Sequence, residues 1–341
     1  MSDIHVRVEG RVGRITLTRP QALNALTTGM VAAIDAAVTA WRDDPAIACV
    51  LIDAEGDRAF SAGGDIQEVY RCAKAGDVAF AQGFWADEYR LNVKIARYPK
   101  PYIALCQGYT MGGGAGVSLH GRHRVVCESS RIAMPECAIG LVPDIGGTAL
   151  LSGGPGHLGE YLGVTGHRMG PGDAIRAGFA DHFVPREAWA DLTARVIETA
   201  EADAILAFSR PPPPSDLEPL QPEIDAAFSA PDLATLAARL EATDWGRSVL
   251  ETMAELCSLS MACTLELVRA ARTEPGIEAA VRREYRFTSR SIEHGELMEG
   301  IRAAIIDKDR APKWRDTLQT VPPERIAAML ASLGADELSF D

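Results

Sequence analysis

The sequence of 341 residues has no long hydrophobic run. Its longest apolar stretch, residues 46–52, is far shorter than the ~20 apolar residues that a membrane-spanning helix needs. The first residues, MSDIHVRVEGR, carry an early acid and no apolar core, so they resemble neither a secretory signal nor a transit peptide. We therefore expect a cytoplasmic protein that has no membrane partner.

Positive charge is also scarce. Lys and Arg number 34 against 47 Asp and Glu, which gives a formal net charge of −13 at pH 7. Because a protein that follows a phosphate backbone needs a basic excess, no nucleic-acid partner is expected. The seven cysteines include no CxxC pair. An odd and dispersed set of cysteines indicates reduced thiols rather than a disulfide framework.

Motifs of cofactor and nucleophile chemistry are missing as well. There is no GK[ST] phosphate loop and no Gly-x-Ser-x-Gly elbow of a serine hydrolase. Residues 154–159 fit GxGxxG, but the residues before them make a poor strand, which disfavours a dinucleotide site. His120, His123 and Cys127 could hold a metal, yet the arginines on both sides of His123 would oppose a cation. We expect no metal ion and no redox cofactor.

The hydrophobic pattern predicts an α/β fold. Strands are expected at residues 5–8, 12–18, 46–52, 101–106, 124–127 and 131–133, the first two joined by a hairpin turn. Helices are expected at residues 28–41, with Thr27 or Thr28 as N-cap, and over most of 65–97, 223–271 and 278–304. Because strands alternate with helices in the first half of the chain, we expect right-handed crossovers and parallel pairing.

The predicted domain organisation follows a change in composition near residue 210. The run Arg210–Ser215 contains four consecutive prolines, so it cannot continue a helix and indicates a stiff, exposed connector. We therefore predict an α/β core at residues 1–205, a proline-rich connector at 206–224 and a helical C-terminal region at 225–341.

Two glycine-rich turns, Ser61–Asp65 and Met111–Gly116, each follow a predicted strand. Glycine lets a ligand approach the backbone closely, and residues 112–114 stand where a helix should begin, so free amides would point outward. Two such amides from separate turns could hold a carbonyl oxygen as negative charge develops on it, which is an oxyanion hole. Alternatively, the glycines only permit tight packing of a helix against a strand, and spacing alone does not decide between the two.

Two acids follow in largely apolar surroundings that are rich in glycine and proline. Glu136 lies in Met-Pro-Glu, and Asp144 lies eight residues later, before Ile-Gly-Gly. Burial there would raise their pKa values, as a general acid or base working near neutral pH requires. Each alone could equally be a helix cap or an ion-pair partner. Their coincidence with the two glycine turns favours a catalytic site.

Five strings of the sequence occur in the order found in the crotonase superfamily, also called the enoyl-CoA hydratase/isomerase superfamily, which the chain resembles. The strings are RPQALNAL (19–26), FSAGGDI (60–66), GYTMGGGAGVSLH (108–120), RIAMPECAIGLVPDIGG (131–147) and TGHRMGPGDAIRAGFADHFV (165–184). Within the superfamily the sequence is most similar to the 3-hydroxyisobutyryl-CoA hydrolases. That narrower similarity rests on residues 87–92, 142–144, 299–302, 306–309 and 312–314.

The resemblance implies a spiral of ββα turns, with helices packed at its C-terminal end. It also implies an acyl-CoA substrate, which contains coenzyme A, so no separate cofactor is expected. By motif position, the amides of Gly64 and Gly113 would form the oxyanion hole, and Glu136 would be the active-site glutamate. Glu88 would bind the 3-hydroxyl group of the acyl chain.

The resemblance further implies contacts with the coenzyme A moiety. The backbone around Ala25, Leu26 and Ala62 would contact its adenine and pantetheine parts. Because the moiety carries several negative charges, basic side chains must offset the repulsion of an acidic protein. The candidates are Arg19, Arg58 and Lys308, although each could be an ordinary solvated charge.

One departure from the hydratases bears on the reaction. A hydratase uses two glutamates that share the added water, and at the position of the first this chain has Gly116. It has Asp144 where a hydratase has glycine, as the hydrolases do. The resemblance therefore implies hydrolysis of a short-chain β-hydroxyacyl-CoA thioester, as in valine catabolism. Glu136 would be a base or a nucleophile, and Asp144 would orient the substrate or protonate the leaving sulfur. Enoyl-CoA isomerisation or hydration, non-catalytic acyl-CoA binding and assembly into a homo-oligomer are left open.

Overall fold

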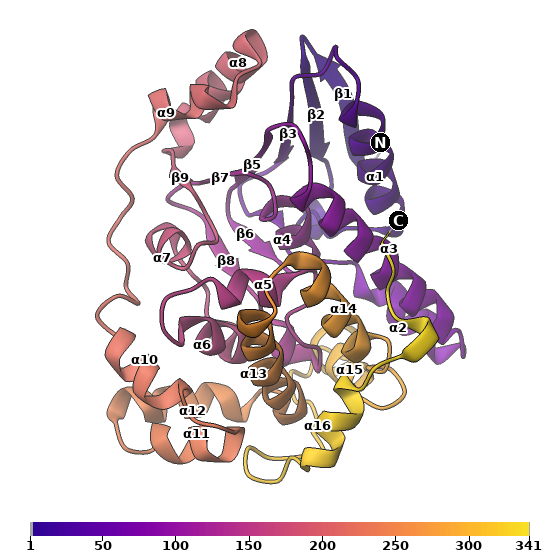
Figure 1. The fold of residues 1–341 in the computed structure, drawn as a ribbon, viewed down its shortest axis with the longest axis vertical. Coiled ribbons are helices and arrows are strands. Elements are labelled where there is room, and N and C mark those ends of the chain that lie inside the picture. Colours follow the sequence, from indigo (N-terminus) through magenta and orange to yellow (C-terminus); the bar gives the residue numbers. More distant parts are fainter. Residues whose placement is uncertain (1–2, 341) are drawn as a thin grey trace. The chain divides into compact units, whose positions relative to one another are not determined.

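The computed structural model describes residues 3–340, which form two compact units that are each discontinuous in sequence (Figure 1). Unit 1 comprises the chain up to Gly64, Arg90–Ala133 and Arg168–Asp216, and unit 2 comprises Asp65–Tyr89, Met134–His167 and the chain from Leu217. Residues 1 and 2, which begin the predicted core, and residue 341, which ends the predicted helical region, lie outside the described part. The expectation that the N-terminus is neither a signal nor a transit peptide falls partly on these residues.

Unit 1 is built on a six-stranded sheet with the order β1-β2-β3-β5-β7-β9. Its strands are β1 (Ile4–Glu9), β2 (Val12–Leu17), β3 (Cys49–Ala54), β5 (Tyr102–Cys106), β7 (His123–Val126) and β9 (His182–Phe183). The first pair is an antiparallel hairpin, and each further neighbouring pair is parallel. The predicted α/β class and parallel pairing are confirmed. β3 begins later than the predicted strand, because Ala46 and Ile47 form a turn on Asp44.

A second sheet of unit 1 carries both glycine turns. It has three parallel strands in the order β4-β6-β8, namely β4 (Ala59–Ser61), β6 (Tyr109–Met111) and β8 (Arg131–Ala133). One turn begins where β4 ends and the other begins where β6 ends. Because β4 and β6 are neighbours and run in the same direction, the two turns leave the sheet at the same edge.

Helices cover the sheets of unit 1. They are α1 (Thr28–Arg42), the second half of α3 (Val78–Ala96), α4 (Gly113–Ser118), α7 (Pro171–Arg176), α8 (Trp189–Thr199) and α9 (Ile205–Phe208), with the short turns η1 (Pro20–Ala22), η3 (Arg186–Ala188) and η4 (Ala202–Ala204). Thr27 caps α1 by accepting a hydrogen bond of 3.2 Å from the Met30 amide, as expected. Trp189, Leu192 and Val196 of α8 share one hydrophobic cluster with buried residues of β2, β3, β5 and β7, which holds α8 on the sheet.

Unit 2 is almost entirely helical. Its elements are α2 (Ile66–Lys74), the first half of α3, η2 (Glu136–Ile139), α5 (Gly147–Ser152), α6 (Leu158–Thr165), α10 (Gln221–Phe228), α11 (Leu233–Leu240), α12 (Asp244–Ala254), α13 (Ser258–Thr273), α14 (Ile277–Thr288), α15 (Leu297–Ile301), the π-helical η5 (Arg302–Ile306), α16 (Pro323–Leu330) and η6 (Gly334–Asp336). α13 is largely buried, because it packs against α5, α6, α14 and α16. Every helix within residues 3–340 is too short or too polar to span a lipid bilayer.

The helical segments are more divided than the hydrophobic pattern predicts. The predicted helix 223–271 is four helices, because Asp232 and Thr243 cap the N-termini of α11 and α12 and so start new helices. The predicted helix 65–97 is two helices separated at Gly76, whose φ is +85°. Apolar spacing continues across such breaks, so periodicity alone does not reveal them.

The proline run at residues 211–214 is exposed and non-helical, as predicted. The compact units do not follow the predicted boundaries at residues 205 and 224, because residues 65–89 and 134–167 belong with the C-terminal helices. Because the compact units are discontinuous in sequence, they do not test the division of the chain into a core, a connector and a helical region, which stays a prediction.

The GxGxxG string at residues 154–159 follows helix α5 and not a strand. A Cβ atom on Gly159 would collide with the carbonyl group of Leu151. This glycine therefore serves the close packing of α5 against α6. A dinucleotide-binding turn needs a preceding strand, and the string lacks one.

Candidate active site

Unit 2 buries four carboxylates that act on one another electrostatically, and we call Glu88, Glu136, Asp144 and Glu284 the acid cluster. They come from α3, the start of η2, the turn before α5, and α14. Their exposed fractions are 3%, 4%, 4% and 0%. The sequence predicted the first three as site residues, and the structure brings them together with a fourth that it did not predict.

Asp144 is held by a tyrosine. The Tyr89 hydroxyl donates a hydrogen bond of 2.6 Å to Asp144 Oδ2, and the Tyr89 ring meets the Tyr285 ring edge-on with 6.2 Å between centroids. Burial raises the pKa of Asp144 to about 6, although the hydrogen bond from Tyr89 acts in the opposite direction. Asp144 therefore changes its charge close to neutral pH.

Glu136 has an unsatisfied carboxylate. It is the first residue of η2, and both of its carboxylate oxygens are buried without a hydrogen bond. Burial, and next the charge of Asp144, raise the pKa of Glu136 well above its ordinary value. Two acids that interact in this way titrate as a pair, and the acid with the lower pKa ionises first. The raised pKa values therefore favour a proton on the pair above the pH at which a free carboxyl group loses it.

The turn that carries Glu136 is fixed by packing against α15. A Cβ atom on Gly300 of α15 would collide with the carbonyl group of Ile139. A Cβ atom on Gly140, whose φ is +76°, would lie 2.7 Å from the backbone that leads into α15. These two glycines let α15 approach η2 closely. Gly300 belongs to the string 299–302, so part of that string supports the turn that carries Glu136.

Glu88 is buried beside the residue that binds Asp144. Its Oε1 atom has no hydrogen-bond partner. Burial, and next the charge of Asp144, raise the pKa of Glu88 to about 8. A carboxyl group that stays protonated at neutral pH can donate a hydrogen bond to a ligand.

Two residues of this region were missed by the sequence analysis. Glu284 lies on the buried stripe of α14 with Ala280 and Phe287, and burial raises its pKa to about 7. A glutamate on an apolar helix stripe is the signal that could have found it, since buried acids are rare without a special partner. Tyr89 follows Glu88 directly, but nothing in the sequence indicates that its hydroxyl meets Asp144.

In unit 1 the two glycine turns lie side by side. A Cβ atom on Gly63 would be 3.9 Å from the nitrogen of Gly113. Gly113 is the first residue of α4, so its amide has no acceptor within the helix. A Cβ atom on Gly114 would lie 2.6 Å from Ser61, so this glycine is required for packing, as the alternative interpretation predicts. The oxyanion hole of Gly64 and Gly113 stays a prediction, which the adjacency of the turns favours.

The backbone expected to contact coenzyme A is joined to the first glycine turn. The Leu26 amide donates a hydrogen bond of 2.9 Å to the Gly63 carbonyl, and the Ala62 amide donates one of 3.0 Å to the Leu23 carbonyl. Ala25, Leu26 and Ala62 therefore lie in one hydrogen-bonded stretch of unit 1. Their contact with a ligand stays a prediction.

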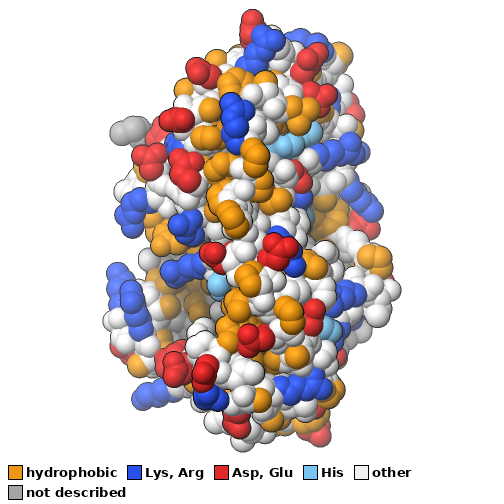
Figure 2. Space-filling view, turned by 90° about the vertical axis from the view of Figure 1, so that its left-hand side faces the viewer, with side chains coloured by type: hydrophobic (Ala, Val, Ile, Leu, Met, Phe, Trp, Pro, Cys, Tyr) orange, Lys and Arg blue, Asp and Glu red, His pale blue; other side chains and the backbone are white. Residues whose placement is uncertain are grey.

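The three basic candidates for the phosphates differ in their surroundings. Arg19 Nη1 donates a hydrogen bond of 2.6 Å to the Ala25 carbonyl, which links this cation to the predicted coenzyme A segment. Arg58 and Lys308 are exposed. On the face drawn in Figure 2, Lys and Arg side chains are interspersed with Asp and Glu and do not gather in one basic patch.

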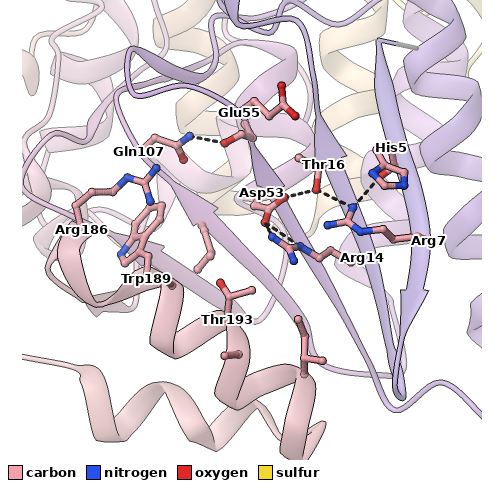
Figure 3. Close-up of a pocket in the computed structure, with 15 residues that line it drawn as sticks. His5, Arg7, Arg14, Thr16, Asp53, Glu55, Gln107, Arg186, Trp189 and Thr193 are labelled. Atoms are coloured by element: carbon pink, nitrogen blue, oxygen red, sulfur yellow. Dashed lines mark hydrogen bonds and ion pairs between the residues drawn. The ribbon is translucent and has the colours of Figure 1, made fainter. Parts of the chain in front are cut away.

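A hollow of about 560 Å³ in unit 1 has none of the predicted site residues among the described residues that line it (Figure 3). It lies between the first strands of the large sheet and α8. Arg14 Nη2 is 2.7 Å from Asp53 Oδ2, and the Thr16 hydroxyl donates a hydrogen bond of 2.6 Å to the same carboxylate. Because these groups satisfy one another, we assign the hollow no chemistry. Within residues 3–340, no three His, Cys, Asp or Glu side chains are arranged to hold a metal ion.

The family follows from comparison with known proteins. Residues 12–330 match the family model described as enoyl-CoA hydratase/isomerase. The chain therefore belongs to this family and is an enzyme of the crotonase superfamily, as the strings around its glycine turns and acids predicted.

Its relatives carry the names of several reactions. Over 345 residues the chain is 37% identical to the mitochondrial 3-hydroxyisobutyryl-CoA hydrolase of Xenopus tropicalis, a match that covers 97% of this chain and 89% of the relative. A solved enoyl-CoA hydratase from Rhodobacter sphaeroides 2.4.1 is 51% identical with a TM-score of 0.96, and the match covers 99% of this chain and 100% of that one. A solved carnitinyl-CoA dehydratase from Mycobacterium thermoresistibile is 40% identical with a TM-score of 0.95, over 100% and 99% of the two chains.

These relatives confirm the predicted crotonase fold and the resemblance to the 3-hydroxyisobutyryl-CoA hydrolases. Their names differ between hydrolase, hydratase and dehydratase, so the reaction has to be argued from the site. Since the hydrolase relative is named as mitochondrial, the cytoplasmic location expected for this chain stays a prediction.

Proposed function

We propose that the chain hydrolyses a short-chain β-hydroxyacyl-CoA thioester, with 3-hydroxyisobutyryl-CoA of valine catabolism as the first candidate substrate. The observation that carries the proposal is that Glu136 and Asp144 are both buried in unit 2 and act on one another electrostatically. Two acids with raised pKa values let one group accept a proton while the other donates one. The name of the Xenopus relative supports the same reaction.

In the proposed reaction, the thioester oxygen accepts hydrogen bonds from the amides of Gly64 and Gly113. Loss of one such donor typically costs about 3–4 kcal/mol of barrier, so the two amides would be a major part of catalysis. Glu136 then takes a proton from water as the water oxygen bonds to the carbonyl carbon. Alternatively, Glu136 attacks that carbon itself and forms an anhydride, which water opens. In either route the C–S bond breaks, the sulfur leaves with the bonding electrons, and an acid of the pair protonates it.

The protonation state of the free site bears on these roles. Glu136 has to be ionised before it can act as base or nucleophile, and burial opposes this ionisation. We assign Asp144 as the acceptor of the Glu136 proton, since the two acids act on one another electrostatically. A proton that moves from Glu136 to Asp144 would leave Glu136 as the base and Asp144 as the acid for the leaving sulfur.

Glu88 gives the proposal its preference for hydroxyacyl chains. Its buried Oε1 has no partner in the protein, and its raised pKa keeps the group protonated. A buried carboxyl group of this kind is satisfied by a hydroxyl group on the acyl chain and is left unsatisfied by an alkyl chain. A site that hydrogen-bonds a substrate hydroxyl group typically rejects the analogue without it by a large factor.

Hydration or dehydration is the second candidate, because the two solved relatives are named for those reactions. Against it stands position 116, where the chain has a glycine in α4 and not the first of two water-holding glutamates. Glu136 alone could still move a proton within an enoyl-CoA, as in isomerisation. The two candidates differ in whether free thiol appears.

The test is an assay of the purified chain with 3-hydroxyisobutyryl-CoA, 3-hydroxypropionyl-CoA, isobutyryl-CoA and crotonyl-CoA. We expect thiol release from the two hydroxyacyl thioesters, weaker release from isobutyryl-CoA, and no loss of the enoyl absorbance of crotonyl-CoA. Glu136→Gln should lower kcat more than about 10³-fold, because it removes the base or nucleophile. Glu251→Gln, an exposed change on α12, is the matched control and should keep full activity. Loss of enoyl absorbance without free thiol, or full activity of Glu136→Gln, would overturn the proposal.

A further inference from the structure

The carboxylate of Glu284 holds the backbone that follows Asp144. Its Oε2 accepts a hydrogen bond of 2.7 Å from the Gly146 amide, and its Oε1 accepts one of 2.9 Å from the Thr148 amide. The Thr148 hydroxyl donates a further hydrogen bond of 2.5 Å to Oε1. The three partners lie at the start of α5, and Glu284 is 138 residues from Gly146 in sequence. The side chain therefore ties α14 to the active-site turn.

The turn that Glu284 holds has an unfavourable backbone. Ile145 has φ +57° and Gly146 has φ +78°. A β-branched residue rarely adopts positive φ, and such strain persists only where the surroundings enforce it. Packing contributes as well, because a Cβ atom on Gly147 would collide with Met134. The direction of the Asp144 side chain thus depends on groups that fix the residues after it.

We propose that Glu284 is a positioning residue, which fixes the turn 144–148 so that Asp144 meets Tyr89 and stays coupled to Glu136. The inference rests on the proposed function, since it assigns Glu284 to the same pair of acids. Glu284 does not touch the reacting atoms in this proposal. It acts through the backbone amides of the turn and through its negative charge.

The charge of Glu284 acts on groups of several elements. Asp144, Glu136 and the Tyr89 hydroxyl all interact with it electrostatically, and each is neutral or anionic. Three arginines on the helices packed against α14 are used elsewhere. Arg269 of α13 donates hydrogen bonds to the Ala230 and Pro231 carbonyls, and Arg272 of α13 pairs with Glu160 at 2.7 Å. Arg325 of α16 pairs with Asp316 and Glu296.

Loss of Glu284 should change the ionisation of Asp144 through the turn. The hydrogen bond from Tyr89 lowers the pKa of Asp144, so an Asp144 that no longer meets Tyr89 should ionise at higher pH. The acid limb of the pH profile marks the pH at which the pair gains its charge, and this limb should therefore move to higher pH. A residue that only stabilises the fold would lower the yield of active protein without moving the limb.

The experiment compares Glu284→Gln, Glu284→Asp and Glu160→Gln in the full chain. Glu160 is the matched control, because it is also fully buried in unit 2 but pairs with Arg272 and His157. For Glu284→Gln we expect a fall in kcat of about 10–100-fold, as a misplaced catalytic group produces, and an acid limb at higher pH. Glu284→Asp keeps a carboxylate that can accept hydrogen bonds from the turn, so its limb should lie closer to the wild-type position than that of Glu284→Gln. Glu160→Gln should keep both kcat and the limb.

Hydrogen–deuterium exchange supplies a readout that needs no turnover. The peptide that covers residues 143–152 should exchange faster in Glu284→Gln than in wild type, and Glu160→Gln should leave it unchanged. If the exchange of this peptide or the acid limb stays at its wild-type value in Glu284→Gln, the positioning role is wrong. If wild type releases no thiol, the proposed function fails, while the exchange measurement still decides whether Glu284 holds the turn.

Discussion

The hollow of unit 1 and the acid cluster of unit 2 both gather carboxylates, but they neutralise them differently. In the hollow, Asp53 accepts hydrogen bonds from Arg14 and Thr16. Beside the hollow, partial burial alone would raise the pKa of Glu9, yet the hydrogen bonds and charges of Arg7 and Arg14 lower it. Asp53 and Glu9 both pair with arginines, and Arg14 joins neighbouring strands through them.

In the acid cluster the hydrogen-bond partners are a phenol, a threonine hydroxyl and backbone amides, and no arginine or lysine among the described residues bonds to its carboxylates. Burial therefore dominates, and the pKa values of Asp144, Glu284 and Glu88 rise to about 6, 7 and 8. A carboxylate with a cation partner supports the structure, whereas one buried without a cation can exchange protons near neutral pH. The contrast explains why we do not take the hollow of unit 1 as the candidate active site.

The largest effect should come from exchanging an acid for an amide in each region. Asp144→Asn should lower kcat for 3-hydroxyisobutyryl-CoA by about 10²–10³-fold, because the pair can no longer pass a proton. Asp53→Asn is the matched change in the hollow and should leave kcat unchanged. Steady-state thiol release measures both. Equal losses in the two variants would remove the distinction between the regions.

A second prediction concerns stability and pH. The pKa of Glu88 is about 8 in the folded protein, whereas a glutamate in the unfolded chain has its ordinary pKa of 4.5. Between these two pH values the folded state holds a proton that the unfolded state has lost. Glu88 therefore makes the free energy of unfolding fall as pH rises from about 5 to about 8, by about 1.4 kcal/mol for each unit of pKa difference. Glu88→Gln should flatten this fall.

Urea unfolding of wild type and Glu88→Gln at pH 5, 7 and 9 measures the effect. The variant should gain stability relative to wild type at pH 9 compared with pH 5. The comparison between pH values cancels any constant cost of burying the amide. A parallel pH dependence of the two proteins would show that folding does not raise the pKa of Glu88.

The smallest effect is expected from the hollow itself. Asp53→Asn leaves Arg14 without its closest carboxylate, and this pair is only partly exposed. Loss of a partly buried ion pair should lower the free energy of unfolding by about 1–2 kcal/mol. Thermal and urea unfolding at neutral pH measure the loss. An unchanged stability would mean that the hollow's ion pairs are not structural.

The sequence predicted much of unit 1 because its signals are local. Alternation located β1 and β2, apolar runs located β3 and β5, and Thr27 marked the start of α1. The same reasoning selected both glycine turns, Glu136 and Asp144, whereas Glu88 came from the family resemblance, and β4 and β6, which precede the turns, were not predicted. Each of these inferences depends on residues within about one turn or strand of each other.

The partners of those acids were not predictable in the same way. Tyr89 and Asp144 are 55 residues apart, and Glu284 and Thr148 are 136 residues apart. Nothing in the local pattern around Glu284 distinguishes it from an exposed glutamate except its place on the buried stripe of α14. The breaks within the predicted helix 223–271 were missed for a related reason, since a cap changes the backbone without changing the apolar period.

The sequence by itself determined the α/β class, the family, the glycine turns and the residue types that could carry acid–base chemistry, because these follow from short-range patterns and from matching strings. The tertiary structure decided which acids are buried together, which of them lack a cation and which backbone turn holds Asp144 in place. Burial and pairing depend on segments that are distant in the chain, and they set the pKa values on which the proposed reaction depends.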